Sequence, residues 1–343
     1  MTRTDIRIAL PSKGALADDS LALLADAGLK VRRPNPRQYQ ATIPVLPGVT
    51  VIFQRPGDIV VGVRQGSIDF GITGYDIVAE KGSINGDQPI LLLHDALGFG
   101  HCALHLATPE SSSARAMADL RAWAAELAEN GRSLRIATKF PHTTAKFLQQ
   151  HAITPVKLID AEGTLEIAPA VGYADLIADL VSSGLTLRDN HLRPLDDGQI
   201  LASQAVLIAN RAALQSRPEA RAVARALLEY IEAYLRAQGS YLIIANVRGE
   251  SAQTIVRQMA QRPTIAGLQG PTIAPVMSAP GSREQWFSVS IVVRKDSLVA
   301  AIADLRAIGG SGVIAAPLTY IFEEEPERYR QMLTALQDPG ETS

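Results

Sequence analysis

The chain has 343 residues, and its 33 basic side chains nearly balance its 35 acidic ones, which gives a net charge of −2. That length predicts two or three domains of roughly 150 residues, and a hydrophobic content of 47% with 20% charged residues excludes wholesale disorder. The near-neutral balance argues against a nucleic-acid partner, no apolar stretch is long enough for a membrane span, and the single cysteine, Cys102, fits a cytoplasmic protein.

Short apolar segments alternate with amphipathic helices through the first 238 residues. In chain order the pattern predicts a strand at 6–10, a helix at 15–28, short apolar segments at 49–53, 58–63 and 69–74, a helix at 114–130, a strand at 134–138, a helix at 142–151, strands at 174–181 and 205–210, and a long helix at 218–237. This alternation is typical of an α/β protein with mostly parallel sheets.

The pattern changes near residue 239. Beyond it we expect strand, helix, strand, strand, helix and strand at 241–247, 251–261, 272–277, 286–293, 296–308 and 313–316. That order is the ferredoxin-like plan. In the fourth of these segments apolar residues alternate with Ser288 and Ser290, which predicts a half-solvated antiparallel strand. We expect the acidic run at 323–327 to be a solvated tail and PGSR at 280–283 to be a turn.

The strongest chemical signal is an acidic strand that runs into the loop Ser-Ser-Gly-Leu-Thr-Leu. Asp175 and Asp179 stand four residues apart, so on a strand both carboxylates project from one face. The loop offers hydroxyls, backbone N–H groups and, at Gly184, a residue that accepts positive φ. The combination suits a phosphorylated sugar, with ribose hydroxyls on the carboxylates, directly or through Mg²⁺. The alternative is a strand edge with two solvated aspartates followed by an ordinary turn, and spacing alone leaves both open.

Further loops could hold an anion. Lys13 stands in Pro-Ser-Lys-Gly between a strand and a helix, where it reaches a phosphate or is a surface lysine in a tight turn. Asp76 follows Gly74 at the end of an apolar segment, where open α/β sheets bind ligands, although a helix N-cap by Asp76 is equally open. Arg55 and the turn at 138–144 are other basic or hydroxyl-bearing loops.

Other motifs are not favoured. Gly98-Phe-Gly-His-Cys-Ala103 formally matches a dinucleotide fingerprint, but a strand-like ALHLATP follows where a helix is needed. His101 and His105 could share a face and bind a metal, but no third ligand stands nearby. Cys102 in its apolar run is typical of a small buried hydrophobe and not of a nucleophile.

Taken together, these segments resemble one family, the long form of ATP phosphoribosyltransferase, which opens histidine biosynthesis. The similar segments are IRIALPSKGAL, RPGDIVVGVRQGSIDFGITGYDIV, LRIATKFPHTTAKFL, LEIAPAVGYADLIADLVSSGLTLRDNHL, SQAVLIAN and a C-terminal part from SYLIIANV to LTYIF. They extend from residue 5 to 322. Leu185 departs from the family, which often has a polar or basic residue there, and we interpret the long stretches at 34–48, 109–131 and 278–284 as surface insertions.

The resemblance implies a pentosyltransferase that joins adenine N1 of ATP to phosphoribosyl pyrophosphate and releases pyrophosphate, with Mg²⁺ as its cofactor. In this family Asp175 and Asp179 correspond to an acidic pair for the ribose hydroxyls and the metal. The remaining substrate-binding residues that the resemblance implies are Ser182, Ser183, Gly184, Leu185, Thr186 and Leu187 for the 5-phosphate, Lys13, Arg55, Gly74 and Asp76 near the nucleotide and pyrophosphate, and Glu162, Gly163 and Thr164 in a loop that faces the substrates.

The resemblance also implies a two-lobed α/β catalytic core like a type II periplasmic binding protein, followed by a ferredoxin-like (ACT-like) regulatory domain. The expected parts are catalytic lobe I at 1–98 and 204–238, lobe II at 99–203, the regulatory domain at 239–325 and a tail at 326–343. The implied regulation is inhibition by L-histidine, at Asn246, Leu268, Gly270 and Thr272, with AMP as a further inhibitor. The implied assembly is a homodimer that forms a homohexamer.

A non-catalytic, two-lobed protein that binds or senses a small ligand is the alternative. The segment DFGITGYD and a two-lobed architecture also occur in solute-binding proteins and ligand-sensing regulators. The chain shows no export signal and no DNA-binding segment, and it keeps both the Asp pair and the Ser-Ser-Gly loop. We therefore favour the enzyme.

Overall fold

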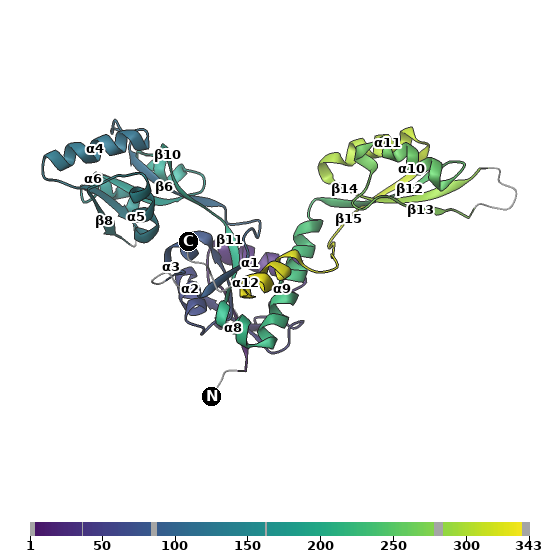
Figure 1. Cartoon of the computed structure of the whole chain (residues 1–343), viewed down its shortest axis with the longest axis horizontal. Coiled ribbons are helices and arrows are strands. Elements are labelled where there is room, and N and C mark those ends of the chain that lie inside the picture. Colours follow the sequence, from purple (N-terminus) through teal and green to yellow (C-terminus); the bar gives the residue numbers. More distant parts are fainter. Residues whose placement is uncertain (1–3, 36, 84–87, 162, 278–283, 338–343) are drawn as a thin grey trace. The chain divides into compact units, whose positions relative to one another are not determined.

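The computed structural model describes residues 4–35, 37–83, 88–161, 163–277 and 284–337. The chain forms two compact units, the first from Met1–Leu228 together with Glu327–Ser343 and the second from Glu229–Pro326. Unit 1 contains a six-stranded and a five-stranded sheet, which we call the sheets of lobe I and lobe II, and unit 2 contains a four-stranded sheet (Figure 1). In the described part of the chain no helix is both long enough and apolar enough to cross a membrane.

The sheet of lobe I has the strand order β2-β3-β1-β4-β11-β5. Its strands are β1 (Ile6–Pro11), β2 (Gln40–Thr42), β3 (Val49–Gln54), β4 (Phe70–Gly74), β5 (Ile90–His94) and β11 (Ala205–Asn210), and its helices are α1 (Ala15–Asp26), α2 (Pro56–Arg64), α3 (Tyr75–Lys81) and α8 (Arg211–Ser216). Strand β1 pairs in parallel with β3 and β4, whereas β11 is antiparallel to β4 and β5. The carboxyl ends of β1, β3 and β4 therefore meet at one edge.

The apolar segment at 58–63 is a helix. Pro56 occupies a first-turn position of α2, where its missing N–H costs nothing. Ile59, Val60 and Val63 then lie on one buried face of α2, which packs so closely on β4 that a side chain at Gly71 would overlap Ile59. A short apolar run has no periodicity that separates a buried strand from a buried helix, and here the proline settles it.

The sheet of lobe II has the order β10-β6-β9-β7-β8. Its elements are β6 (Cys102–Pro109), α4 (Met117–Glu129), β7 (Leu134–Thr138), α5 (Pro141–Gln150), β8 (Val156–Asp160), η1 (Leu165–Ile167), α6 (Ala168–Val171), β9 (Leu176–Val181), α7 (Leu185–Asp189) and β10 (Leu192–Ser203). Strand β7 is parallel to β8 and β9, and β6 is antiparallel to β9 and β10. Leu176 and Ala178 pack on one face of this sheet and Ile177 on the other, each against a buried cluster.

Both lobes follow one plan, in which three parallel strands are followed by an antiparallel strand that arrives from the other lobe. In lobe I this strand is β11, and in lobe II it is β6. The chain thus crosses between the sheets twice, and the second crossing needs only Gln204 between β10 and β11. The predicted two-lobed α/β core is confirmed.

Unit 2 contains β12 (Ser240–Arg248), α10 (Ala252–Ala260), η2 (Pro263–Ile265), β13 (Thr272–Pro275), β14 (Trp286–Arg294), η3 (Lys295–Ser297), α11 (Leu298–Ala307) and β15 (Gly310–Pro317). The strand order is β13-β14-β12-β15, and every pairing is antiparallel. Helices α10 and α11 lie on one face of this sheet (Figure 1). Val289 and Ile291 are buried beneath them while Ser288 and Ser290 face the other way. The ferredoxin-like prediction is confirmed, including the half-solvated strand; the predicted turn at 280–283 lies outside the described residues.

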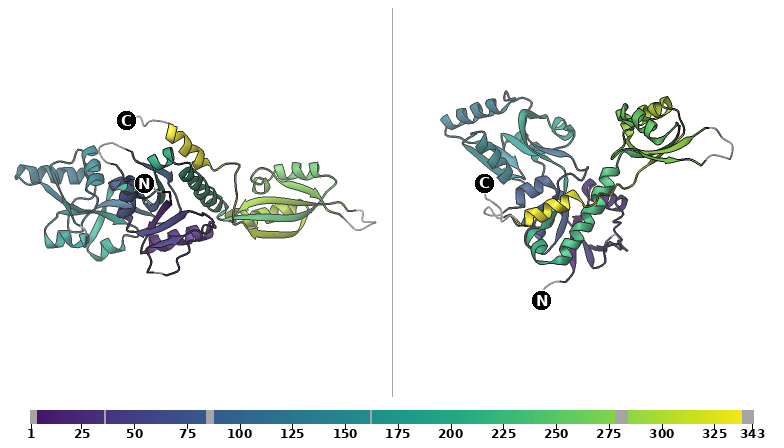
Figure 2. Two further views of the ribbon diagram at one scale, coloured as in Figure 1. Left: turned by 90° about the horizontal axis from the view of Figure 1, so that it is seen from below. Right: turned by 45° about the vertical axis from the view of Figure 1, so that its right-hand side comes forward.

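Helix α9 (Pro218–Ala237) leads from unit 1 to unit 2, and α12 (Glu327–Gln337) belongs to unit 1 again. Helix α12 was not predicted from the sequence. Glu323 and Glu324 are exposed, but α12, the yellow helix of Figure 2, follows them. It packs beside β5 and α8. Met332 is 3% exposed there, and the guanidinium of Arg328 lies 2.6 Å from the carboxylate of Asp95. The acidic run is therefore a short link, not the start of a solvated tail.

Candidate functional site

Three loops meet at one edge of the lobe II sheet, because β7, β8 and β9 are parallel and each is followed by a loop at its carboxyl end. The turn at Lys139 follows β7, the segment with Gly163 and Thr164 follows β8, and residues 182–184 follow β9. The residues named in these loops are exposed, apart from the half-buried Gly184. Glu162, which we also expect in the second loop, lies outside the described residues.

Asp179 is a half-buried carboxylate near this edge, where Asp160 ends β8 as an exposed one. It lies in β9, directly opposite His105 of β6. Burial raises the pKa of Asp179 above the ordinary 3.8, and Glu166 raises it further, while the Leu180 N–H and Lys139 act in the opposite direction. A half-buried carboxylate of this kind gains from a cation or from hydroxyl donors, since both favour its charged form.

Asp175 lies at the opposite edge of the sheet. It precedes β9, and its carboxylate accepts the backbone N–H of Arg135 at 2.8 Å and pairs with the Arg135 guanidinium at 2.7 Å. Burial alone would raise the pKa of Asp175, but the hydrogen bonds and charge of Arg135 bring it below 3.8. Four residues of strand span about 13 Å. The two aspartates therefore share a face, but the carboxylate of Asp175 is already paired with Arg135 at the other end of the strand, which argues against the expectation that both act on one substrate.

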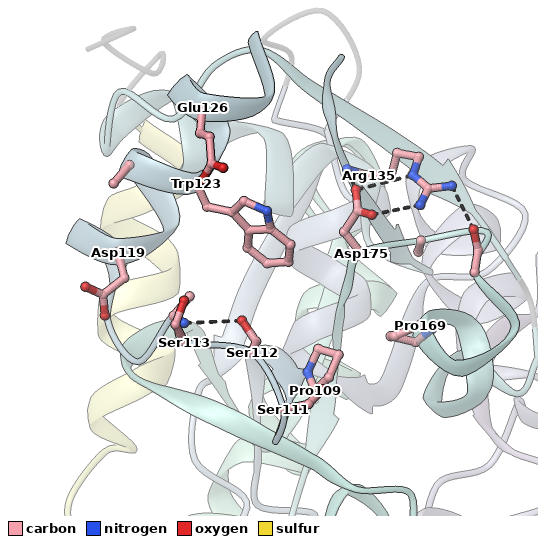
Figure 3. A pocket seen from close by; sticks show the side chains of 14 residues that line it. Pro109, Ser111, Ser112, Ser113, Asp119, Trp123, Glu126, Arg135, Pro169 and Asp175 are labelled. Atoms are coloured by element: carbon pink, nitrogen blue, oxygen red, sulfur yellow. Dashed lines mark hydrogen bonds and ion pairs between the residues drawn. The ribbon is translucent and has the colours of Figure 1, made fainter. Parts of the chain in front are cut away.

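A cavity of about 630 Å³ lies beside Asp175. Its lining includes three consecutive serines at 111–113, the indole of Trp123 from α4, and the Arg135–Asp175 pair (Figure 3). The guanidinium of Arg135 is already bonded to Asp175 and to the carbonyl oxygen of Gly172. Because of these bonds, the Arg135 guanidinium is not free to bind a phosphate. The cavity also lies at the amino ends of β7 and β9, away from the three loops.

The Ser-Ser-Gly loop has the backbone that the sequence predicted. Gly184 has φ 72°, the left-handed region that favours glycine, and caps α7. Helix α7 has only five residues, so an anion at this loop would be held by the backbone N–H groups of the loop and not by a helix dipole. Ser182, Ser183, Leu185 and Thr186 are exposed, whereas Leu187 is 4% exposed and packs into the lobe core. Leu187 thus anchors the loop and does not face a substrate.

Two exposed cations lie at the matching edge of lobe I. Lys13 follows β1 and Arg55 follows β3, both at carboxyl ends of parallel strands. The Ser12 N–H donates to the Gln54 carbonyl oxygen at 2.9 Å, which ties the first loop to the second. The two cations therefore lie on neighbouring loops, as a polyanion would require.

Asp76 faces inward. It is 5% exposed. Its carboxylate accepts a hydrogen bond from the Ser203 hydroxyl at 2.6 Å, and its backbone N–H donates to Oγ of Ser203 at 2.9 Å. Burial raises the pKa of Asp76, and hydrogen bonds from Ser203 and from nearby backbone lower it in part. A side chain at Gly74 would overlap this carboxylate, which explains the glycine. The expectation that Asp76 lies near the nucleotide and pyrophosphate stays a prediction, and its carboxylate is already bonded to Ser203 at the end of the strand that returns from lobe II.

Sequence reasoning missed a polar row beside Asp179. His105 lies opposite Asp179 on one side and opposite Gln199 of β10 on the other. Burial lowers the pKa of His105, although a hydrogen bond with Gln199 raises it in part, so the imidazole is neutral at pH 7. From the sequence, His105 was considered only with His101 as a metal pair. In the described residues no group of three or more His, Cys, Asp and Glu side chains could hold a metal ion.

In unit 2, Asn246 and Thr272 are both exposed and lie on the sheet face that the helices leave open. Asn246 pairs with Ser288 and Thr272 with Ser290, so the four polar side chains share that face. Leu268 is 54% exposed, and Gly270 has φ 97° just before β13.

Comparison with known proteins gives a consistent result over almost the whole chain. The family model described as ATP phosphoribosyltransferase matches residues 55–233, and the model described as HisG, C-terminal domain, matches residues 237–320. ATP phosphoribosyltransferase 2, chloroplastic, of Arabidopsis thaliana is 43% identical over 342 residues, which cover 97% of this chain and 81% of that protein. The ATP phosphoribosyltransferase of Methanothermobacter thermautotrophicus is 34% identical over 317 residues, with 92% and 99% covered. The solved ATP phosphoribosyl transferase (HisG:HisZ) complex from Thermotoga maritima aligns at 23% identity and a TM-score of 0.49, covering 66% of this chain and 96% of that one.

Proposed function

The chain belongs to the ATP phosphoribosyltransferase family, and from that premise we propose how its residues carry out the reaction. The enzyme joins ATP and phosphoribosyl pyrophosphate in the pentosyl transfer that opens histidine biosynthesis. Adenine N1 carries a free lone pair, so its attack on the ribose carbon needs no strong base. Catalysis then rests on bringing two polyanions together and on stabilising a ribose that becomes positively charged as pyrophosphate leaves.

Phosphoribosyl pyrophosphate binds at the three-loop edge of lobe II. Asp179 accepts the ribose hydroxyls, with neutral His105 beside it as a second hydrogen-bonding group. The loop at 182–186 takes the 5-phosphate through its backbone N–H groups and exposed hydroxyls, and Lys139 adds a positive charge. Support comes from the raised pKa of Asp179, which a hydroxyl donor or cation would relieve, and from the left-handed Gly184. Gly163 and Thr164 border the same substrate.

ATP binds at the lobe I edge, where exposed Lys13 and Arg55 hold its phosphates or the leaving pyrophosphate. Gly74 and Asp76 shape this edge from behind. Mg²⁺ takes oxygen ligands and keeps several waters, so one carboxylate and the substrate's own phosphates are enough to hold it. Asp179 is the protein ligand that fits, and the ion would neutralise the departing pyrophosphate.

The regulatory part of the proposal concerns unit 2. L-Histidine binds on the open sheet face near Asn246 and Thr272, with Leu268 and Gly270 at its border, and lowers activity. AMP competes at the nucleotide loops. The enzyme assembles as a homodimer and a homohexamer and acts in the cytoplasm, where its single cysteine stays reduced.

The observation that carries the catalytic proposal is that Asp179 lies with the Ser-Ser-Gly loop while Asp175 does not. We expect Asp179→Asn to lower pyrophosphate release from ATP plus phosphoribosyl pyrophosphate by about 10²-fold or more, with the melting temperature unchanged. Asp175→Asn is the matched control and keeps turnover. His105→Ala should raise KM for phosphoribosyl pyrophosphate about tenfold, the loss of one hydrogen bond, while exposed His101→Ala should not.

Two results would contradict this proposal. Wild-type protein that releases no pyrophosphate from the two substrates in Mg²⁺ buffer removes the reaction itself. Asp179→Asn with wild-type kinetics removes only the role of that residue, and points instead to the loop backbone as the main contact.

A further inference from the structure

Glu80, in the last turn of α3, is the cap of a helix in the other lobe. Its side chain is 3% exposed. One oxygen accepts the His142 N–H at 3.0 Å and lies 2.9 Å from the His142 imidazole, and the other accepts the Thr143 N–H at 2.9 Å and the Thr143 hydroxyl at 2.7 Å. Both of these residues belong to the first turn of α5, so a carboxylate of lobe I binds the N-terminus of a helix of lobe II.

The first turn of a helix needs partners for its free N–H groups. Helix α5 has Phe140 at its N-cap, which provides no side-chain hydrogen bond, and Pro141 at its first position. Glu80 supplies the hydrogen-bond acceptors that the local sequence lacks at this helix N-terminus. Its negative charge is also favourable at the positive end of the helix dipole. Burying a carboxylate without such partners would be strongly unfavourable. We call these contacts the Glu80 clasp.

Helix α3 is held at its other end as well. Asp76 in its first turn is bonded to Ser203, and the Tyr75 N–H donates to the Gln204 carbonyl oxygen at 2.9 Å. Ser203 and Gln204 mark the point where the chain returns from lobe II to lobe I. The seven residues of α3 therefore contact lobe II at both ends.

The clasp lies next to the proposed phosphoribosyl site. Helix α5 begins directly after the turn that follows β7, and Lys139 is in that turn. The Phe140 N–H donates to the Thr138 hydroxyl at 3.0 Å, which leaves the turn little freedom of its own. The positive charge of Lys139 lowers the pKa of Asp179 in part, which shows that the two side chains are close enough to interact. The position of this cation relative to the loops of lobe I is thus set through α5 and Glu80.

We propose that Glu80 is a positioning residue of the transferase: its carboxylate holds the turn between β7 and α5 against lobe I, so that the substrates of the two lobes meet in a reactive geometry. This inference rests on the proposed function. Each substrate is held by loops of one lobe, so the clasp has little influence on either binding step alone. It acts on the encounter of adenine N1 with the ribose carbon, where a displacement of about 1 Å costs about 10²-fold in rate.

The test is a graded series in the full-length protein. His142→Ala removes only the imidazole contact, Thr143→Val removes the hydroxyl, and Glu80→Gln places an amide N–H₂ against donors that need an acceptor. We expect kcat to fall in that order, to about 10–10²-fold below wild type for Glu80→Gln. The dissociation constant of each substrate, measured alone by calorimetry, should change less than about threefold. Thr143→Ser, which keeps the hydroxyl, should restore kcat, and exposed Glu129→Gln on α4 is the control.

A distance measurement separates this role from the reaction. Spin labels at Asp18→Cys in α1 and Glu129→Cys in α4, in a Cys102→Ser background, report the spacing between the lobes by pulsed electron resonance. A broader distribution in Glu80→Gln together with lower kcat supports the proposal. Unchanged distances, or broader distances with wild-type kcat, overturn it. A wild-type protein that shows a narrow distribution but no turnover defeats the proposed function and leaves the clasp itself intact. If Glu80→Gln does not fold, Thr143→Val and Thr143→Ser carry the same comparison.

Discussion

At the scale of single residues, Asp175 and Asp179 differ only through their neighbours. They have the same side chain and point to the same face, Asp175 just before β9 and Asp179 within it. Arg135, which neutralises Asp175, is 40 positions away in the sequence, and His105, which lies beside Asp179, comes from another strand. Spacing along one strand predicts the face of a side chain but not its partners, so the sequence indicated both aspartates and could not separate them.

Asp175 is expected to contribute to stability in a pH-dependent way. Since its folded-state pKa lies below the ordinary 3.8, the carboxylate stabilises the fold above that value, and the contribution is lost as the pH falls through the folded-state pKa. Asp175→Asn should cost about 1–2 kcal/mol at pH 7, a moderate figure because Arg135 is partly exposed. Urea unfolding at pH 7 and near pH 3 should show the gap closing on acidification. A variant as stable as wild type at pH 7 would show that the pair is only a surface contact.

At the scale of elements, prediction succeeds where the sequence itself carries the whole signal. The strands at 134–138 and 205–210 are short, mostly apolar segments, and both appear with the predicted bounds. Strand β10 was not anticipated, because its 12 residues include Arg, Asp and Gln and two register irregularities against β6. A strand of this kind is specified by its neighbour, so long-range pairing rather than local pattern determines it.

Helix α12 was likewise not predicted from its local sequence pattern. Its packing on unit 1 can be tested. Met332 is its most buried side chain, and the Arg211 guanidinium donates to the Ala335 carbonyl oxygen at 2.6 Å. Met332→Ala should lower the free energy of unfolding by about 2–3 kcal/mol, the cost of removing a buried methionine. Exposed Gln331→Ala should stay within about 0.5 kcal/mol of wild type. Equal stabilities in urea unfolding of the full chain would mean that α12 is not docked in solution.

At the scale of the whole molecule, the near-zero net charge conceals a local arrangement. Exposed cations occupy loops at the carboxyl ends of parallel strands in both lobes, with Lys13 and Arg55 in one and Lys139 in the other. Acidic groups such as Glu80 and Asp76 are buried behind these loops, where their carboxylates accept hydrogen bonds from the protein itself. Charge counted over the whole chain therefore does not indicate where phosphates would bind.

The feedback control that we propose would involve both units at once. The open face of the unit 2 sheet has a polar cluster around Asn246 and Thr272, amid apolar neighbours such as Ile244 and Ile314. A ligand that binds only the folded protein stabilises it, by about 2.7 kcal/mol at a concentration 100 times its Kd. L-Histidine should therefore raise the melting temperature of the full chain and lower its rate of pyrophosphate release.

The discriminating variant for this control is Asn246→Ala. Because Asn246 lies far along the chain from every substrate loop and in a separate unit, its loss should abolish the thermal shift with L-histidine and the inhibition together while turnover without histidine stays at the wild-type rate. Val299→Ala, an 80% exposed position on α11, is the matched control, since α11 covers the opposite sheet face, and it should keep both responses. Inhibition that survives Asn246→Ala with its thermal shift intact would contradict the assignment and place the histidine site elsewhere, at the substrate loops if a higher concentration of either substrate relieves the inhibition, because a ligand that binds only the folded protein stabilises it at whichever site it occupies.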